Sequence, residues 1–207
     1  MTVTNITELS KSRVRIEIDH EFAFVLYKGE LRLYKIEVGK QIEDADFCKL
    51  KEEVLPKRAK LRAMNLLKSR AYTRMQLKDK LIQGGYPEDI ANLAIDYVTS
   101  YGYVDDEQFA KDFIEYNRER KSKKRICMDL MQKGISEQLF QNAWDSVVGE
   151  NSDEMEKEQI LYWMGKKHFQ PQNATFEEKQ KMMAFLYRKG FSINNIRNVL
   201  SLDITHI

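Results

Sequence analysis

The chain has 207 residues, of which 43% are hydrophobic and 32% are charged, with only three prolines and nine glycines. This composition is typical of a helix-rich globular protein and excludes both an intrinsically disordered and a collagen-like chain. The formal net charge is only +2. No global field therefore points to nucleic acid, and any basic surface must come from local patterning.

Several classes of site and segment are missing from the sequence. The first residues carry neither the basic region nor the apolar core of a signal peptide, and no apolar run approaches the roughly 18 residues of a membrane span. We therefore expect a cytoplasmic protein with no membrane contact. The two cysteines and three histidines have no ligand spacing, and no phosphate loop or nucleophile elbow is present. We expect no metal, no cofactor and no enzyme activity.

The N-terminal segment has the period of a β-sheet. Val14, Ile16 and Ile18 alternate with charged residues, which predicts a half-buried strand. Lys28-Gly29-Glu30 is a turn signal, and the apolar residues from Leu31 to Val38 predict another strand after it. We predict a three-stranded antiparallel meander within a β-rich extension of residues 1–43. It is either a small capping sheet or a docking edge for a partner.

Near Asp44 the apolar spacing becomes helical, so residues 44–56 are predicted to form a connecting helix or linker. Pro56 predicts the start of a new helix, because the first turn does not use the N–H that proline lacks. Everything after Pro56 has the pattern of helices.

The helical part contains an internal repeat anchored by Gly85, Gly134 and Gly190. Apolar residues stand eight and four positions before each glycine and one position after it; they are Leu77, Leu81 and Tyr86, then Ile126, Leu130 and Ile135, then Met182, Leu186 and Phe191. We predict a mainly α fold of three tandem three-helix repeats, residues 57–103, 104–150 and 151–207. Repeats of this size bury little alone, so we expect them to stack in an elongated, curved array.

Capping boxes support the predicted helix starts. The pattern occurs three times, as Thr73-x-x-Gln76, Asp153-x-x-Glu156 and Thr175-x-x-Glu178. In each, the first side chain is expected to accept from the third backbone N–H of the helix, while the second reaches back to the cap.

A helix–turn–helix joint separates the first repeat from the second. Gly102 fits the left-handed position just past a helix end, and Asp105 or Asp106 suits the N-cap of the next helix. Tyr103 and Phe109 are expected to pack on either side of the turn. Carboxylates at a helix start complement the helix dipole, so we interpret this acidic cluster as a cap and not as a catalytic or metal site.

Basic residues concentrate in two runs that occupy the same place in successive repeats. Residues 57–80 include nine Lys or Arg and one acid, Asp79, and a second run covers residues 118–125. Stacking would align the runs into a stripe suited to phosphates or to an acidic protein groove, although a merely solvated helix face is the alternative. The candidate binding residues are Lys57, Arg58, Arg62, Arg70, Arg74, Lys78, Arg118, Arg120, Lys123, Lys124 and Arg125.

Sequence-specific reading of DNA bases is weakly supported. It requires an exposed recognition helix with outward Arg, Asn or Gln. The third helices of the first two repeats carry hardly a basic residue, and that of the last repeat has only Arg197, with Asn194, Asn195 and Asn198. An autonomous helix–turn–helix DNA-binding regulator is therefore one alternative for the function, and a helical scaffold for some partner is another.

From about Arg58 to Leu200 the chain resembles the RecX family of recombination regulators. The most specific motifs are Gly102-Tyr103-Val104-Asp105-Asp106 with Phe109-Ala110, Lys133-Gly134-Ile135, and Arg188-Lys189-Gly190-Phe191-Ser192. Gln76 and Ser122 depart from the family pattern, which usually has Glu and often Gly there. The N-terminal β segment is the least specific part of the resemblance.

The resemblance implies a cytoplasmic, non-enzymatic protein that binds the RecA recombinase and its filament on single-stranded DNA. Family members mostly inhibit the ATPase, strand-exchange and coprotease activities of RecA, by lying in the filament groove or by blocking filament growth. We accordingly expect the partners to be the RecA filament and, weakly and non-specifically, single-stranded DNA, and we expect the chain to be a monomer.

Overall fold

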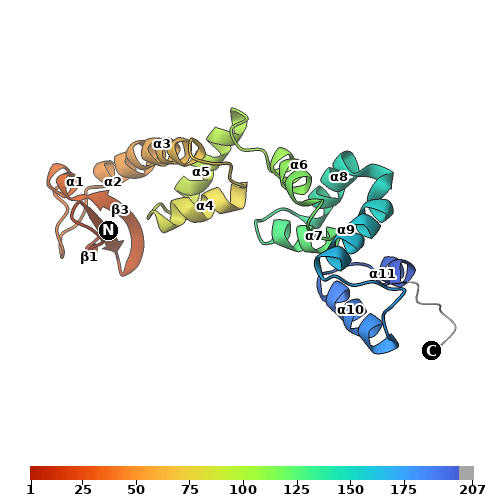
Figure 1. Cartoon of the computed structure of the whole chain (residues 1–207). Helices are drawn as coiled ribbons and strands as arrows, with labels where there is room; N and C mark the ends of the chain where they lie inside the picture. Colours follow the sequence, from red (N-terminus) through yellow and green to blue (C-terminus); the bar gives the residue numbers. More distant parts are fainter. Residues whose placement is uncertain (201–207) are drawn as a thin grey trace. The chain divides into compact units, whose positions relative to one another are not determined.

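The computed structural model describes residues 1–200, apart from the side chain of Glu150, and the chain divides into two compact units after Asp105 (Figure 1). Unit 1 contains a small sheet and the first helical repeat, and unit 2 contains the second and third repeats. The predicted mainly α fold with an N-terminal antiparallel sheet is confirmed. Residues 201–207, which the predicted third repeat includes, lie outside the described part.

The sheet is antiparallel with the strand order β1-β2-β3. Its strands are β1 (Val3–Glu8), β2 (Arg13–Ile18) and β3 (Glu21–Tyr27). The alternation predicted for β2 is confirmed, because Val14, Ile16 and Ile18 are buried and the residues between them are not. Val14 lies opposite Leu26 of β3, so the two buried rows meet in one core.

The prediction of a strand from Leu31 to Val38 was wrong, and β1 takes its place at the other edge of the sheet. The β2–β3 turn is at Asp19 and His20, which both have left-handed backbones with φ of 50° and 69°. Lys28 begins the short helix α1 (Lys28–Leu33) and not a turn. The Glu30 carboxylate accepts from the Tyr27 N–H at 2.7 Å, which satisfies a free donor at the helix start.

A single run of helical turns then leads into the first repeat. It consists of α2 (Asp44–Lys49), the π-helical segment η1 (Leu50–Val54) and α3 (Leu55–Leu67). Pro56 lies in the first turn of α3, as predicted, but no break precedes it. The wider π turn upstream leaves room for a proline ring inside a continuous helical run.

The remaining helices follow the predicted repeats. They are α4 (Arg74–Gln83) and α5 (Glu88–Ser100) in unit 1, then α6 (Asp106–Asn117), α7 (Lys123–Met131), α8 (Glu137–Val147), the 3₁₀ segment η2 (Gly149–Asn151), α9 (Ser152–Lys166), α10 (Phe176–Arg188) and α11 (Ile193–Leu200) in unit 2. Gly85, Gly134 and Gly190 follow the second helix of each repeat with φ of 91°, 88° and 90°. The apolar residues predicted around them are buried.

Two of the three predicted capping boxes are confirmed, those of Thr73 with Gln76 and of Thr175 with Glu178. The third, at Asp153, was wrong because α9 begins one residue earlier and Glu156 bonds elsewhere. The Glu156 carboxylate accepts from the backbone N–H of Ser192 at 2.9 Å, at the start of α11. At the joint, Gly102 is left-handed and α6 begins at Asp106, which puts Asp105 at the N-cap position.

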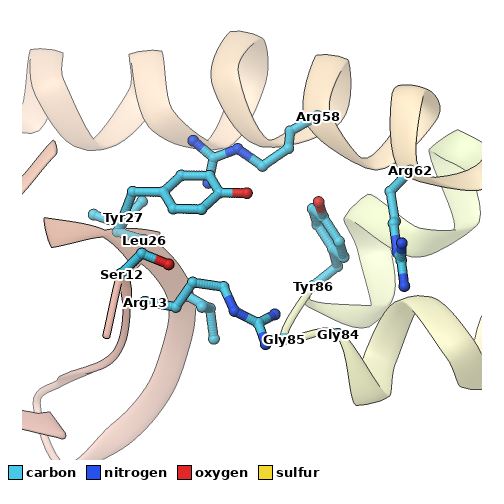
Figure 2. Close-up of a pocket in the computed structure, with 10 residues that line it drawn as sticks. Ser12, Arg13, Leu26, Tyr27, Arg58, Arg62, Gly84, Gly85 and Tyr86 are labelled. Atoms are coloured by element: carbon cyan, nitrogen blue, oxygen red, sulfur yellow. The ribbon is translucent and has the colours of Figure 1, made fainter. Parts of the chain in front are cut away.

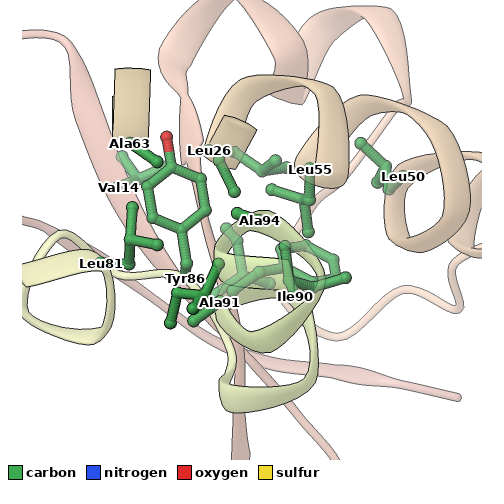
Figure 3. Close-up of a cluster of buried hydrophobic side chains, with 14 of the residues drawn as sticks. Val14, Leu26, Leu50, Leu55, Ala63, Leu81, Tyr86, Ile90, Ala91 and Ala94 are labelled. Carbon is green, nitrogen blue, oxygen red and sulfur yellow. The ribbon is translucent and has the colours of Figure 1, made fainter. Parts of the chain in front are cut away.

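In unit 1 the sheet and the first repeat share one hydrophobic core, in which Val14 and Leu26 meet Leu81 and Tyr86 (Figure 3). The closest approach is at Gly85, where a Cβ atom would lie 2.2 Å from Val25 Cγ2. A left-handed backbone without a side chain is thus required there for two reasons, conformation and space. The sheet is seated directly on the turn between α4 and α5.

In unit 2 polar bonds tie the third repeat to the second. Gln159 of α9 is only 3% exposed and donates to the carbonyls of Arg118 and Lys121, which lie in the turn after α6. Ser122, the N-cap of α7, donates to the Lys189 carbonyl at 2.7 Å and lies against Gly190. These bonds satisfy carbonyls that a helix end leaves without partners.

We predict that Gly85→Ala destabilises the protein by about 3 kcal/mol, the sum of a left-handed alanine and an overpacked contact. Gly39→Ala is the matched control: its φ is 80° but nothing lies within 4 Å. It should cost only about 1 kcal/mol. Urea unfolding followed by circular dichroism measures both. Equal losses of unfolding free energy in the two variants would contradict a tight contact between Gly85 and Val25. Adding Val25→Ala to Gly85→Ala should restore part of the lost stability.

We predict that Gln159→Leu destabilises the protein by about 2 kcal/mol, because two half-buried carbonyls lose a donor that is itself buried. The control is Gln138→Leu, which removes an exposed amide bonded to Asn142 and should change the unfolding free energy by less than about 0.5 kcal/mol. The same urea titration reports both variants. If Gln159→Leu unfolded like its control, the bonds between the two repeats would not stabilise the protein.

Candidate nucleic-acid and partner interface

Some of the first basic run is neutralised within its own repeat. Arg74 Nη2 lies 2.7 Å from a carboxylate oxygen of Asp96, and Lys78 Nζ lies 2.6 Å from one of Glu88. Both acids belong to α5, which packs beside α4. Exposed ion pairs of this kind stabilise a fold only slightly, but they reduce the charge that a partner would meet.

Other cations of this run lie over aromatic rings. Arg70 Cζ is 4.3 Å from the centroid of the Tyr72 ring, and Lys60 Nζ is 4.7 Å from that of Tyr97. These contacts orient the side chains and leave their charge intact. Lys57 is exposed and makes no ion pair with any residue that the structure describes.

Arg58 and Arg62 face a cleft between the sheet and the first repeat, which we call the sheet cleft (Figure 2). Its volume is about 350 Å³. Arg58 forms an ion pair with Glu30 and stacks over the Tyr27 ring, 4.7 Å from its centroid. Arg62 is exposed. The first run therefore points in more than one direction, and Arg58 and Arg62 are the members that line the sheet cleft.

The second basic run lines a groove between the second and third repeats, which we call the repeat groove. Its volume is about 420 Å³. Arg120 and Arg125 come from the α6–α7 region, and Arg188 and Lys189 come from the end of α10. Lys189 Nζ lies 3.8 Å from the centroid of the Trp163 ring, which forms an aromatic wall.

The bonds of Gln159 and Ser122 hold the repeat groove in shape. Ser122 joins the start of α7 to Lys189, and Gln159 joins α9, which carries Trp163, to Lys121. The Asp129 carboxylate pairs with two cations of the groove, with Lys121 at 2.8 Å and with Arg125 at 3.0 Å. Within residues 1–200, no ion pair neutralises Arg120 or Arg188. An excess of positive charge therefore remains on a fixed frame.

The other predicted residues of the second run lie around this groove. Arg118 pairs with Glu115 at 2.9 Å, and Lys123 lies over the Trp144 ring at 5.2 Å. Lys124 is exposed, and the base of its side chain lies next to the Gly190 turn. They extend the basic surface beyond the groove without lining it.

The residues predicted as a structural signature lie at turns or stack on neighbouring aromatic rings. Gly85 and Gly190 seat neighbouring elements, as described above. Tyr103 is exposed and stacks on Tyr101, with ring centroids 6.1 Å apart, while Phe109 is half-buried and stacks on Phe113 at 6.4 Å. Gly134 has the backbone of the other two anchors.

Sequence reasoning missed three cations that the structure brings to these hollows. Arg13 lines the sheet cleft, and Arg188 and Lys189 line the repeat groove. Arg188 and Lys189 had a signal, since they directly precede an anchor glycine, and Lys189 is in the same register as Lys133. Arg13 had none, because it alternates with buried strand residues like any exposed strand residue.

The third helices present few groups suited to base reading. In α11, Asn195 is buried and its amide donates to the Asp153 carboxylate at 3.2 Å, so it faces inward. In α5, the exposed Asp96 is the partner of Arg74. Base readout needs outward donors such as Arg or Asn on one face. Asn194 and Asn198 of α11 are exposed, but Arg197 beside them is half-buried and is the one basic residue of that helix.

Two kinds of feature are absent from the described residues. No helix in residues 1–200 combines the length and apolarity needed to span a bilayer. Nor does this part of the chain gather three or more His, Cys, Asp or Glu residues as a metal site would require.

Comparisons with known proteins agree along the whole chain. Models of the first, second and third three-helix domains of RecX match residues 59–97, 105–143 and 153–200. The regulatory protein RecX of Caldanaerobacter subterraneus subsp. tengcongensis is 31% identical, over 98% of this chain and 100% of the relative. That of Clostridium botulinum (strain Eklund 17B / Type B) is 27% identical, over 97% and 94%.

Solved structures share the fold. A crystal structure of regulatory protein RecX superposes with a TM-score of 0.63 at 20% identity, covering 98% of this chain and 99% of that one. RecX from Lactobacillus salivarius gives 0.60 at 19% identity, covering 72% and 96%. With the repeats, the anchor glycines and the three domain matches in agreement, the chain belongs to the RecX family of regulatory proteins.

Proposed function

We propose that this protein binds the RecA recombinase and its filament on single-stranded DNA, and that it inhibits ATP hydrolysis, strand exchange and coprotease activity. Membership of the RecX family supports a regulatory role. In this proposal the protein acts by binding, as a monomer in the cytoplasm, and needs no cofactor. Its own affinity for single-stranded DNA is weak and independent of sequence.

The observation that carries the proposal is the repeat groove. Arg120, Lys121, Arg125, Arg188 and Lys189 converge there, and one acid, Asp129, offsets part of their charge. Arginine forks bind phosphates and carboxylates in two-point contacts. A hollow with this charge suits either the DNA backbone in a filament or an acidic surface of RecA.

The frame of the groove favours a static contact over an adaptable one. Because buried Gln159 and Ser122 fix the segments that carry the cations, less conformational entropy is lost when a partner binds. A pre-organised cationic surface also speeds association with an anionic filament at low salt. Inhibition then follows either from occupation of the filament groove or from blocked growth of the filament end.

We predict that the protein lowers the rate of single-strand-dependent ATP hydrolysis by RecA when it is titrated before and after filament assembly. Inhibition at a molar ratio well below one molecule of this protein per RecA protomer indicates blocked filament ends. Inhibition only when the filament is nearly saturated with the protein indicates groove binding. Steady-state phosphate release measures the rate. An unchanged rate, together with no co-sedimentation on filaments, would rule out the recombinase as the partner.

We predict that Arg120→Glu/Arg188→Glu raises the concentration for half-inhibition at least about tenfold, because the reversed charges repel an anionic partner. The matched control is Lys179→Glu/Lys181→Glu in α10, which changes the net charge equally but lies outside the groove. Circular dichroism checks that both variants keep their helices. Equal weakening by the two pairs would mean that net charge, and not the groove, determines binding.

A further inference from the structure

The sheet cleft is a second basic hollow, formed wholly within unit 1 (Figure 2). The end of the β2–β3 hairpin forms one wall, and α3 with the α4–α5 turn forms the other. Both walls are rigid, because Val25 packs directly on Gly85 beneath the cleft and Leu26 is buried in the shared core. A hollow between packed elements holds its shape without a ligand.

Three guanidinium groups line this cleft, from Arg13 on the sheet and from Arg58 and Arg62 on α3. Glu30 and the Tyr27 ring hold Arg58 in place. Arg13 and Arg62 form no ion pair within residues 1–200, and Figure 2 shows Arg13 extending toward the Gly84–Gly85 turn. One carboxylate thus offsets three cations, and two arginines keep their donors for a ligand.

Tyr86 adds a neutral donor to the same hollow. Its ring is buried, and no hydrogen bond within the described chain uses its hydroxyl. Burial raises the pKa of Tyr86, although Arg58, Arg62 and Arg13 act in the opposite direction. The hydroxyl therefore stays protonated at neutral pH and can donate.

The chemistry of the lining selects an anion with several acceptors. Arg13, Arg62 and Tyr86 offer donors, and Ser12 adds a hydroxyl at the rim. Protein partners usually anchor through apolar or aromatic side chains in a desolvated pocket. Here the apolar lining residues Val25 and Leu26 are already buried in the fold, and Arg58 stacks over the ring of the more exposed Tyr27. Arginine and hydroxyl donors without an apolar anchor are typical of phosphate contacts in nucleic-acid complexes.

We propose that the sheet cleft binds a phosphate group of a single-stranded nucleic acid, with Arg13 and Arg62 as its charged ligands and the Tyr86 hydroxyl as a further donor. The N-terminal sheet is then part of the binding surface. The inference deepens the DNA-binding part of the proposed function, but it requires no recombinase. Binding at this cleft is accordingly tested on the full-length protein alone.

The test compares Arg13→Gln/Arg62→Gln with the matched control Arg15→Gln/Arg32→Gln. The control removes the same charge from exposed arginines of β2 and α1 that do not line the cleft. Fluorescence anisotropy with a labelled oligothymidylate measures affinity across a salt series. We expect the cleft variant to bind at least about tenfold more weakly at low salt. The slope of log K against log salt should fall by about 0.7, the value for the one phosphate of a single strand that the cleft no longer neutralises.

Three further outcomes decide the matter. Equal weakening by the control would overturn the site, because it would show a response to net charge alone. Competition by polyglutamate as strong as that by unlabelled oligothymidylate of equal charge would overturn phosphate in favour of an acidic protein. If inorganic phosphate or adenosine monophosphate raises the melting temperature of the wild type but not of the cleft variant, while oligothymidylate binds both equally, the ligand is a free phosphate and the nucleic-acid assignment is wrong.

These results are separable from those for RecA. Loss of oligothymidylate binding in the cleft variant with unchanged inhibition of ATP hydrolysis would support the sheet cleft and leave the repeat groove as the contact to the filament. Unchanged binding and unchanged slope in a variant that still folds, as judged by circular dichroism, would overturn the inference whatever the outcome with RecA.

Discussion

The structure depends on a backbone constraint that recurs at the end of the second helix of each repeat. A glycine with φ near 90° turns the chain there, and in two repeats the missing Cβ is also the space that a neighbour occupies. Val25 fills it at Gly85, and Ser122 fills it at Gly190. Both basic hollows lie beside these turns. The requirement for glycine thus sets both the packing within each unit and the position of its cations.

A run of basic residues in the sequence does not by itself form a positively charged surface. Arg74 and Lys78 have acids of the adjacent helix within 3 Å, whereas Arg62 and Arg120 have none within residues 1–200. Arg188 joins the second run only through folding. Tertiary structure therefore redistributes a nearly neutral composition into a few places where positive charge is in excess, and those places hold the proposed contacts.

Features with local causes were predictable. The alternation in β2, the anchor glycines and the capping boxes at Thr73 and Thr175 each follow from residues a few positions apart. The errors had two origins. Glu156, in the predicted box, bonds to the distant Ser192, whereas Glu30, in the predicted turn, caps α1 through the Tyr27 N–H three residues away, a local contact that the turn signal hid. No local pattern contains the contact of Glu156, and for the same reason Arg13 could not be recognised as a cleft residue.

The bond between Gln159 and the turn after α6 has a consequence for how unit 2 opens. The carbonyls of Arg118 and Lys121, in the second repeat, accept from Gln159 of the third repeat. Neither repeat can therefore unfold locally here without breaking these bonds and exposing the buried Gln159 amide. The second and third repeats should behave as one cooperative element, sharing a single opening free energy in hydrogen exchange. The second and third repeats would in that case form one folding unit and not two independent modules. The repeat groove between them would exist only while both repeats are folded.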